Sequence, residues 1–170
     1  NNVGKSTICE ALDMAMGLDR LRRHPPVEEF DFYNSHYLDK TVDPPVPLPI
    51  EIEVVLTKLH EELATKCFDR LEHWHSEEKR LLEEGEINLT DNPDVCECLR
   101  IKTIAVYNID EDEFEAKSIF CNGPLKADGS PFEVPRSIRQ LFGFFYLRAL
   151  RTGSRALSLE RGSLLDVILQ

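Results

Sequence analysis

The sequence predicts a mixed chain of helices and strands, of the α/β or α+β class, and three segments carry this prediction. Residues 5–16 place apolar side chains at helical spacing and are followed by a glycine, a common stop after a helix. Residues 50–56 alternate between apolar and acidic side chains and then become fully apolar, as a strand with one buried face does. Residues 99–121 contain two extended apolar runs around a polar turn, which predicts a β-hairpin. At 170 residues the chain is long enough to bury a core.

The segments between and after these three are expected to add one long helix and several short elements. A Pro-rich run at 44–49 predicts a connection, because proline lacks the N–H that a helix or a central strand needs. Apolar side chains at spacings of three, four and seven predict one long amphipathic helix over about 57–84, or two helices with a break near Ser76. After the hairpin we expect a short helix over 136–142, a strand over 144–151 and the start of a helix at 163.

The charge of the chain is unevenly distributed. The formal net charge is −11, which argues against a surface uniformly attractive to nucleic acid. Residues 28–115 carry 8 basic against 24 acidic side chains, whereas residues 116–170 carry 8 basic against 4 acidic ones. Contact with a polyanion is therefore expected near the ends of the chain. No apolar run approaches the roughly 18 residues that a membrane span needs, so a membrane protein is excluded at this stage.

The five cysteines are odd in number and scattered, and no signal peptide precedes them. This favours reduced thiols in a cytoplasmic protein over a disulfide framework. Cys96 and Cys98 could hold a metal ion together with Cys67, His73 or His75. Zinc pairs usually have two or more intervening residues, however, and on a strand the two cysteines would simply share one face.

The most informative motif lies at residues 1–7. A phosphate-binding P-loop has the form G-x-x-x-x-G-K-[ST], and the chain contains its last six positions with a predicted helix directly after them. The candidate nucleotide-binding residues are Asn1, Asn2, Val3, Gly4, Lys5, Ser6 and Thr7. The alternative is an ordinary glycine turn before a helix, and the strand that should precede a P-loop is not in the sequence.

Each residue of this motif has a physical task. Gly4 lets the loop curl around phosphate, and successive N–H groups form a nest for an anion at the positive end of the helix dipole. Lys5 would reach the β and γ phosphates of ATP, and the hydroxyl of Ser6 would bind Mg²⁺. Thr7 could contact the α-phosphate. We therefore expect ATP and Mg²⁺ as cofactors.

The motif and the residues after it resemble a known family of ATPases. Asn-Asn-x-Gly-Lys-Ser-Thr followed by an apolar residue and Cys-Glu-Ala-Leu is similar to the N-terminus of the ABC-type ATPase head of the OLD family of ATP-dependent endonucleases, which is related to SMC-like and RecF-like repair ATPases. A second stretch, residues 145–165, looks like the strand, arginine-rich loop and Gly-Ser helix start of OLD-like heads. The strand at 50–56 and the hairpin suit the β-rich lobe of such heads.

The resemblance implies that residues 1–170 are a partial head domain of a longer protein, truncated at both ends. In this family two heads sandwich ATP, hydrolysis controls DNA processing, and a Toprim nuclease domain can follow. We accordingly expect an ATPase that acts on DNA as a homodimer or higher homo-oligomer, without a membrane. The 170-residue chain alone is expected to be inactive.

Three other functional hypotheses stay open. One is an SMC-like or RecF-like repair ATPase without a nuclease, and another, less favoured, is a P-loop kinase for small molecules or nucleotides. The third is an interaction module without catalytic chemistry. Arg148, Arg151 and Arg155 could contact DNA or nucleotide phosphates, because guanidinium groups match phosphate oxygens. They could equally pair with acidic side chains of the same domain.

Overall fold

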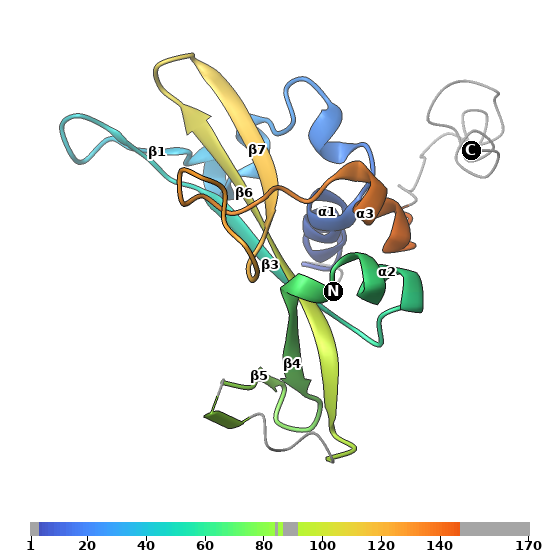
Figure 1. The fold of residues 1–170 in the computed structure, drawn as a ribbon. Helices are drawn as coiled ribbons and strands as arrows, with labels where there is room; N and C mark the ends of the chain where they lie inside the picture. The colour runs from blue at the N-terminus through green and yellow to red at the C-terminus, as the bar shows by residue number, and fades with distance from the viewer. Residues whose placement is uncertain (1–3, 84, 87–91, 147–170) are drawn as a thin grey trace, which may run out of the picture.

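The computed structural model describes residues 4–83, 85–86 and 92–146, and it is mixed α+β with a curled antiparallel sheet. The sheet is built on one long strand, β6 (Val95–Asn108), which runs through its whole length (Figure 1). One edge of β6 pairs with β3 (Ile50–Thr57). Its other edge pairs first with β4 (Leu71–His75) and then with β7 (Glu113–Phe120).

Short elements complete the described part. β5 (Arg80–Leu81) pairs with β4, and β1 (Leu38–Asp39) forms a separate two-stranded sheet with β2 (Val46–Pro47). The α-helices are α1 (Lys5–Met16), α2 (Glu61–Lys66) and α3 (Arg136–Leu141). Single 3₁₀ turns are η1 (Arg20–Arg22), η2 (Glu29–Asp31), η3 (Tyr33–Ser35) and η4 (Phe68–Arg70).

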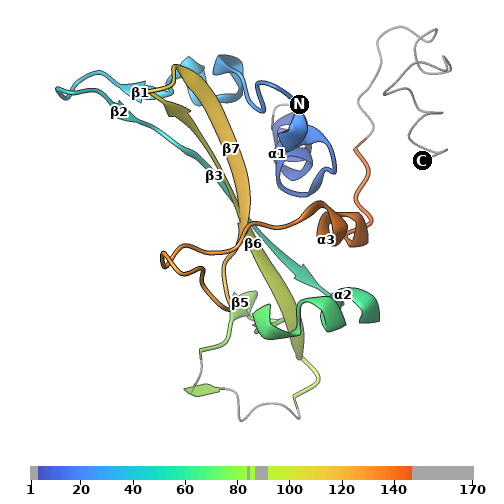
Figure 2. The ribbon, with the colours of Figure 1, turned by 45° about the horizontal axis from the view of Figure 1, so that its top comes forward.

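The three α-helices lie on one side of β6, and the main core lies between them and the sheet (Figure 2). Alternate residues of a strand point to opposite faces, so Leu99 and Ile101 of β6 face the helices together with Phe120 of β7. They pack with Ala15 of α1 and Ile138 of α3, among others. The other face of the sheet carries charged side chains instead.

That charged face is held by ion pairs between neighbouring strands. Arg100 of β6 forms a two-pronged bond with Glu72 of β4, its Nε and Nη2 lying 3.0 and 2.9 Å from the carboxylate oxygens. Lys102 pairs with Glu51 of β3 at 3.0 Å. The alternation of acidic and apolar side chains along β3 thus matches one charged and one buried face.

A smaller core closes the far end of the sheet. Met14 of α1 packs there with Val27 and Phe32, which belong to the segment that follows the helix. Phe32, Tyr37, Tyr107 and Phe114 form a cluster of rings whose centroids lie 5.0–6.1 Å apart. This cluster fixes the segment after α1 against the β6–β7 hairpin.

The prediction of a long amphipathic helix over about 57–84 is wrong. The segment forms the short helix α2, the turn η4 and then the strands β4 and β5. Its regularly spaced apolar residues are divided among these elements: Leu63 lies on α2, Leu71 lies opposite Leu99 of β6, and Trp74 lies opposite Leu81 in the β4–β5 pair. Pairing with β6, which is distant in sequence, overrides the local helical pattern.

The other elements agree more closely with the sequence. The helix over 5–16, the strand over 50–56 and the hairpin over 99–121 are confirmed as α1, β3 and β6–β7, and the helix over 136–142 as α3. Within the Pro-rich run 44–49, two residues form β2. Residues 144–146 are not in a strand, and the rest of the predicted strand and the helix start at 163 lie outside the described residues.

Candidate nucleotide-binding site

The described part of the motif lies at the beginning of α1. Gly4 precedes the helix with a φ of 97° and a ψ of −25°, a left-handed backbone conformation that glycine adopts without steric cost. The carbonyl of Gly4 accepts the N–H of Ile8 at 3.0 Å, the first hydrogen bond of the helix. The glycine of the motif is therefore placed where the chain turns sharply into a helix.

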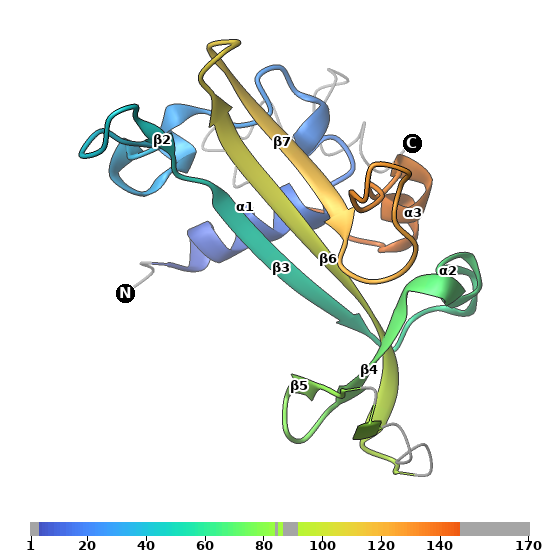
Figure 3. The same cartoon turned by 60° about the vertical axis from the view of Figure 1, so that its left-hand side comes forward.

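The first turns of α1 are exposed. Every residue from Gly4 to Glu10 is exposed, and this end of the helix extends past β3 (Figure 3). The N–H groups of Lys5, Ser6 and Thr7 have no acceptor within the helix, because such acceptors would lie before its start. No described side chain caps this end, and the first turn carries no acidic residue. Among the described residues, nothing therefore covers the positive end of the helix dipole.

The other end of α1 is anchored. Met14, Ala15 and Met16 are buried, and the N–H of Gly17 donates to the carbonyl of Asp13 at 2.8 Å. Nη1 of Arg139, on α3, donates to the carbonyl oxygen of Gly17 at 3.1 Å. The helix is thus fixed to the core at its C-terminal end while its N-terminal end projects.

The structure brings four of the seven candidate residues together. Gly4, Lys5, Ser6 and Thr7 lie in one helical turn, and the exposed side chains of Lys5 and Ser6 suit contacts with phosphate and Mg²⁺. Asn1, Asn2 and Val3 lie outside the described residues.

The candidate arginines Arg148, Arg151 and Arg155 also lie outside the described residues. Two other arginines near the end of α1 are paired with acidic residues. Arg20 binds Asp31 with Nη2 2.9 and 3.0 Å from the carboxylate oxygens, and Arg136 lies 3.6 Å from Asp19.

The cysteines considered for a metal site do not converge. Cys67 is buried with Leu99 in the main core. Cys98 is the neighbour of Leu99 on β6, so its side chain points to the opposite face of the sheet. Burial raises the pKa of the Cys98 thiol to about 12, which disfavours the thiolate that binds metals. The described part of the chain contains no group of three or more His, Cys, Asp or Glu side chains placed to hold a metal ion.

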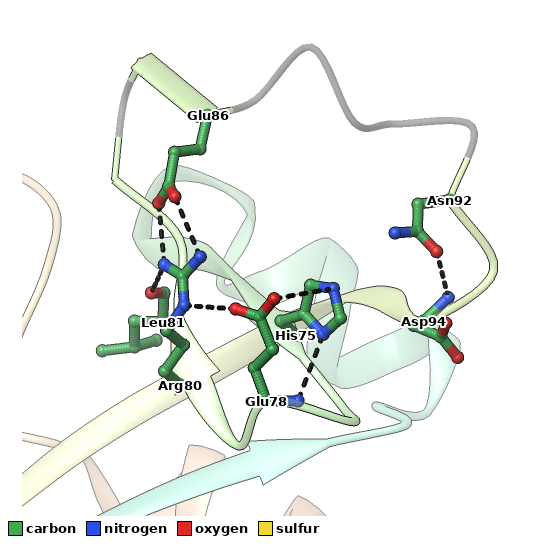
Figure 4. A network of polar contacts seen from close by, with 7 residues as sticks. All are labelled: His75, Glu78, Arg80, Leu81, Glu86, Asn92 and Asp94. Carbon is green, nitrogen blue, oxygen red and sulfur yellow. Dashed lines mark hydrogen bonds and ion pairs between the residues drawn. The ribbon is translucent and has the colours of Figure 1, made fainter.

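His75 instead takes part in a turn. Its Nδ1 accepts the N–H of Glu78 at 3.3 Å, and its Nε2 lies 3.9 Å from the Glu78 carboxylate (Figure 4). Arg80 lies on the other side of the same carboxylate and also binds Glu86 through two nitrogens, at 2.8 and 2.9 Å. These contacts fix the β4–β5 turn and leave His75 with a structural role.

Sequence reasoning missed Arg139. It is 6% exposed and has no carboxylate partner within the described residues, and burial lowers its pKa. Its contact with Gly17 joins positions 122 residues apart, which no local pattern indicates.

No described helix combines the length and the apolar character needed to cross a bilayer. Comparison of the sequence with protein-family models, and of the chain with curated proteins and with solved structures, gives no match.

Proposed function

We propose that this chain is the ATP-binding portion of an OLD-like ATP-dependent endonuclease, in which ATP binding and hydrolysis control DNA processing. The observation that carries the proposal is the Gly-Lys-Ser-Thr sequence at the exposed, uncapped start of a twelve-residue helix. A helix N-terminus offers N–H donors and a positive dipole to phosphate, and the motif adds a lysine and a hydroxyl where these groups are needed.

The residues present suit binding more than turnover. Lys5 would neutralise the β and γ phosphates, Ser6 would bind Mg²⁺, and the N–H groups of α1 would hold the phosphate oxygens. Mg²⁺ would bridge phosphate oxygens and draw off their charge. No described residue is assigned to position the attacking water, so the chain alone should bind ATP weakly and should not hydrolyse it.

The antiparallel sheet supports the ATPase-head hypothesis over the kinase hypothesis. A P-loop kinase is expected to be a compact α/β protein, whereas the strands of the described sheet all pair antiparallel. A repair ATPase without a nuclease has the same nucleotide site and is the second candidate. DNA and a second head are the proposed partners in either case.

The experiment is titration of the 170-residue chain with Mg-ATP by isothermal calorimetry. We expect weak binding that is at least about tenfold weaker in Lys5→Ala, because the lysine supplies charge-assisted hydrogen bonds to phosphate. Lys40→Ala, an exposed lysine far along the chain, is the matched control and should bind as the unchanged chain does. Ser6→Ala should weaken binding in Mg²⁺ but not in EDTA. Equal binding by the Lys5 variant would contradict the proposal, and ATP turnover that Lys5→Ala abolishes would contradict the expected inactivity.

A further inference from the structure

One edge of β7 is only partly covered. The N–H of Cys121 donates to the carbonyl of Arg100, so the backbone groups of odd-numbered positions point toward β6 and those of even-numbered positions point away. Toward the end of β7 these outward groups are used: the N–H of Phe120 donates to Phe132, and the carbonyl of Ser118 accepts from Val134.

Within the part of the chain that the structure describes, the first half of the same edge is open. The outward N–H and C=O groups of Phe114 and Ala116 have no backbone partner among the described residues. Unpaired groups on a strand edge are a template for another strand.

The residues of this open edge also line a groove of about 630 Å³. One wall is residues 113–117 of β7, and the other is the segment after α1, at Leu21–His24 and Pro26. Ile104 and Val106 of β6 complete the lining together with Glu133. Figure 3 shows the segment after α1 beyond β7, on the side away from β6.

We propose that this groove binds an extended polypeptide segment, which joins the sheet as an antiparallel strand next to β7. Such a segment would satisfy the open groups of Phe114 and Ala116, the mode by which a peptide extends a sheet. The groove is bounded on its far side by residues 21–26, so it suits a single extended segment better than the edge of a second sheet. This inference is independent of nucleotide binding.

The charges of the groove favour a polypeptide over a polyanion. Three basic side chains (Arg22, Arg23 and Lys117) are balanced by three acidic ones (Glu113, Glu115 and Glu133). Nucleic acid would need an excess of positive charge. A polypeptide strand that carries both acidic and basic side chains can place each one opposite a groove residue of the opposite charge.

The order of charges along β7 specifies the chemistry of the partner. Glu113 and Lys117 lie at the two ends of the open edge, and neither has an ion pair among the described residues. Directly opposed side chains of antiparallel strands attract when their charges differ. The incoming segment should therefore place an acidic residue opposite Lys117 and a basic one opposite Glu113. Between them it should place apolar residues opposite Phe114 and Ala116, which pack near Leu21.

Two capped peptides of identical composition test this register. Glu-Val-Thr-Val-Lys has the proposed order in the antiparallel direction, and Lys-Val-Thr-Val-Glu has the charges reversed. Each is titrated into the ¹⁵N-labelled 170-residue chain. We expect the first peptide to bind about tenfold more tightly than the second, because two cross-strand pairs change sign. It should also shift the amide signals of Phe114 and Ala116.

The matched variant is Glu113→Lys/Lys117→Glu, which exchanges two exposed charges and should leave the fold intact. It should prefer the second peptide by a similar factor, with an unchanged circular dichroism spectrum. Equal binding of the two peptides, or no binding of either, would overturn the proposal. A preference of the unchanged chain for the reversed peptide would overturn the antiparallel register. A concentration-dependent dimer that shifts the same amides without peptide would assign the edge to a second copy and also overturn it.

Discussion

The buried guanidinium of Arg139 donates a hydrogen bond to the carbonyl oxygen of Gly17, at 3.1 Å, and so ties α3 to the end of α1. The carbonyl belongs to the residue that ends the helix, where the dipole is negative. A cation at this position compensates for groups that the helix cannot satisfy by itself. The proposed nucleotide-binding helix is thereby fixed at its end opposite Lys5.

Replacing Arg139 should therefore destabilise the chain in two separable ways. Arg139→Ala loses both the packing of the side chain and the hydrogen bond, and it should lower the free energy of unfolding by about 3 kcal/mol. Arg139→Met keeps most of the packing and removes a desolvated charge, so it should cost about 1 kcal/mol. Urea denaturation followed by circular dichroism measures both values. Equal costs would show that the hydrogen bond rather than the packing carries the stabilisation.

The turn at Gly123 should tolerate no side chain. Its φ is 106°, and a Cβ there would lie 2.8 Å from both Cγ of Arg70 and the carbonyl oxygen of Asp69. Gly123→Ala should therefore cost about 3 kcal/mol, from backbone strain and from overpacking. Gly129 is the matched control, because its φ is 79° but nothing lies within 4 Å of a Cβ built there.

Gly129→Ala should show the strain alone, at about 1 kcal/mol. Thermal and urea unfolding of the two variants compare the costs. If Gly123→Ala were no worse than Gly129→Ala, the close approach of the 123 turn to η4 would be incorrect.

The elements that the sequence predicted well are those with a strong local pattern. In α1 the apolar spacing predicts a helix and Gly17 marks where it ends. In the β6–β7 hairpin two apolar runs flank a polar turn. The prediction for segment 57–84 failed because its apolar spacing is a local helical pattern, whereas pairing with β6, which is distant in sequence, makes residues 71–75 a strand. Part of the candidate site could be predicted from the sequence because Gly4 to Thr7 are contiguous. The contact of Arg139 and the groove beside β7 could not be predicted, because they depend on residues distant in sequence.

A buried hydroxyl pair joins the centre of the hairpin. Thr103 of β6 and Ser118 of β7 are directly opposite and share a hydrogen bond, and both are buried. Thr103→Val should cost about 1–2 kcal/mol, because it leaves the Ser118 hydroxyl buried without this partner. The double variant Thr103→Val/Ser118→Ala removes both hydroxyls and should be more stable than Thr103→Val alone. A strictly additive double-mutant cycle in urea denaturation would contradict this coupling.

The contacts of Arg80 predict how Glu86 titrates. Two guanidinium nitrogens of Arg80 bind the Glu86 carboxylate (Figure 4). The N–H of Glu83 donates to the same carboxylate at 2.9 Å. These bonds, the Arg80 contact first, lower the pKa of Glu86 from 4.5 to about 2. Because the folded pKa is the lower one, the stabilisation is complete above pH 4.5 and is lost as the pH falls from 4.5 toward 2.

Arg80→Ala should raise the pKa of Glu86 most of the way to its ordinary value, leaving only the effect of the Glu83 N–H. Carboxyl chemical shifts in an NMR pH titration measure this directly. Asp128 is an internal control, because its lowered pKa depends on the hydroxyl and N–H of Ser130 and should not respond to the substitution. If Glu86 of the unchanged chain titrated near 4.5, the ion pair would not persist in solution. If Arg80→Ala left a low pKa in place, the Glu83 N–H would be the dominant cause.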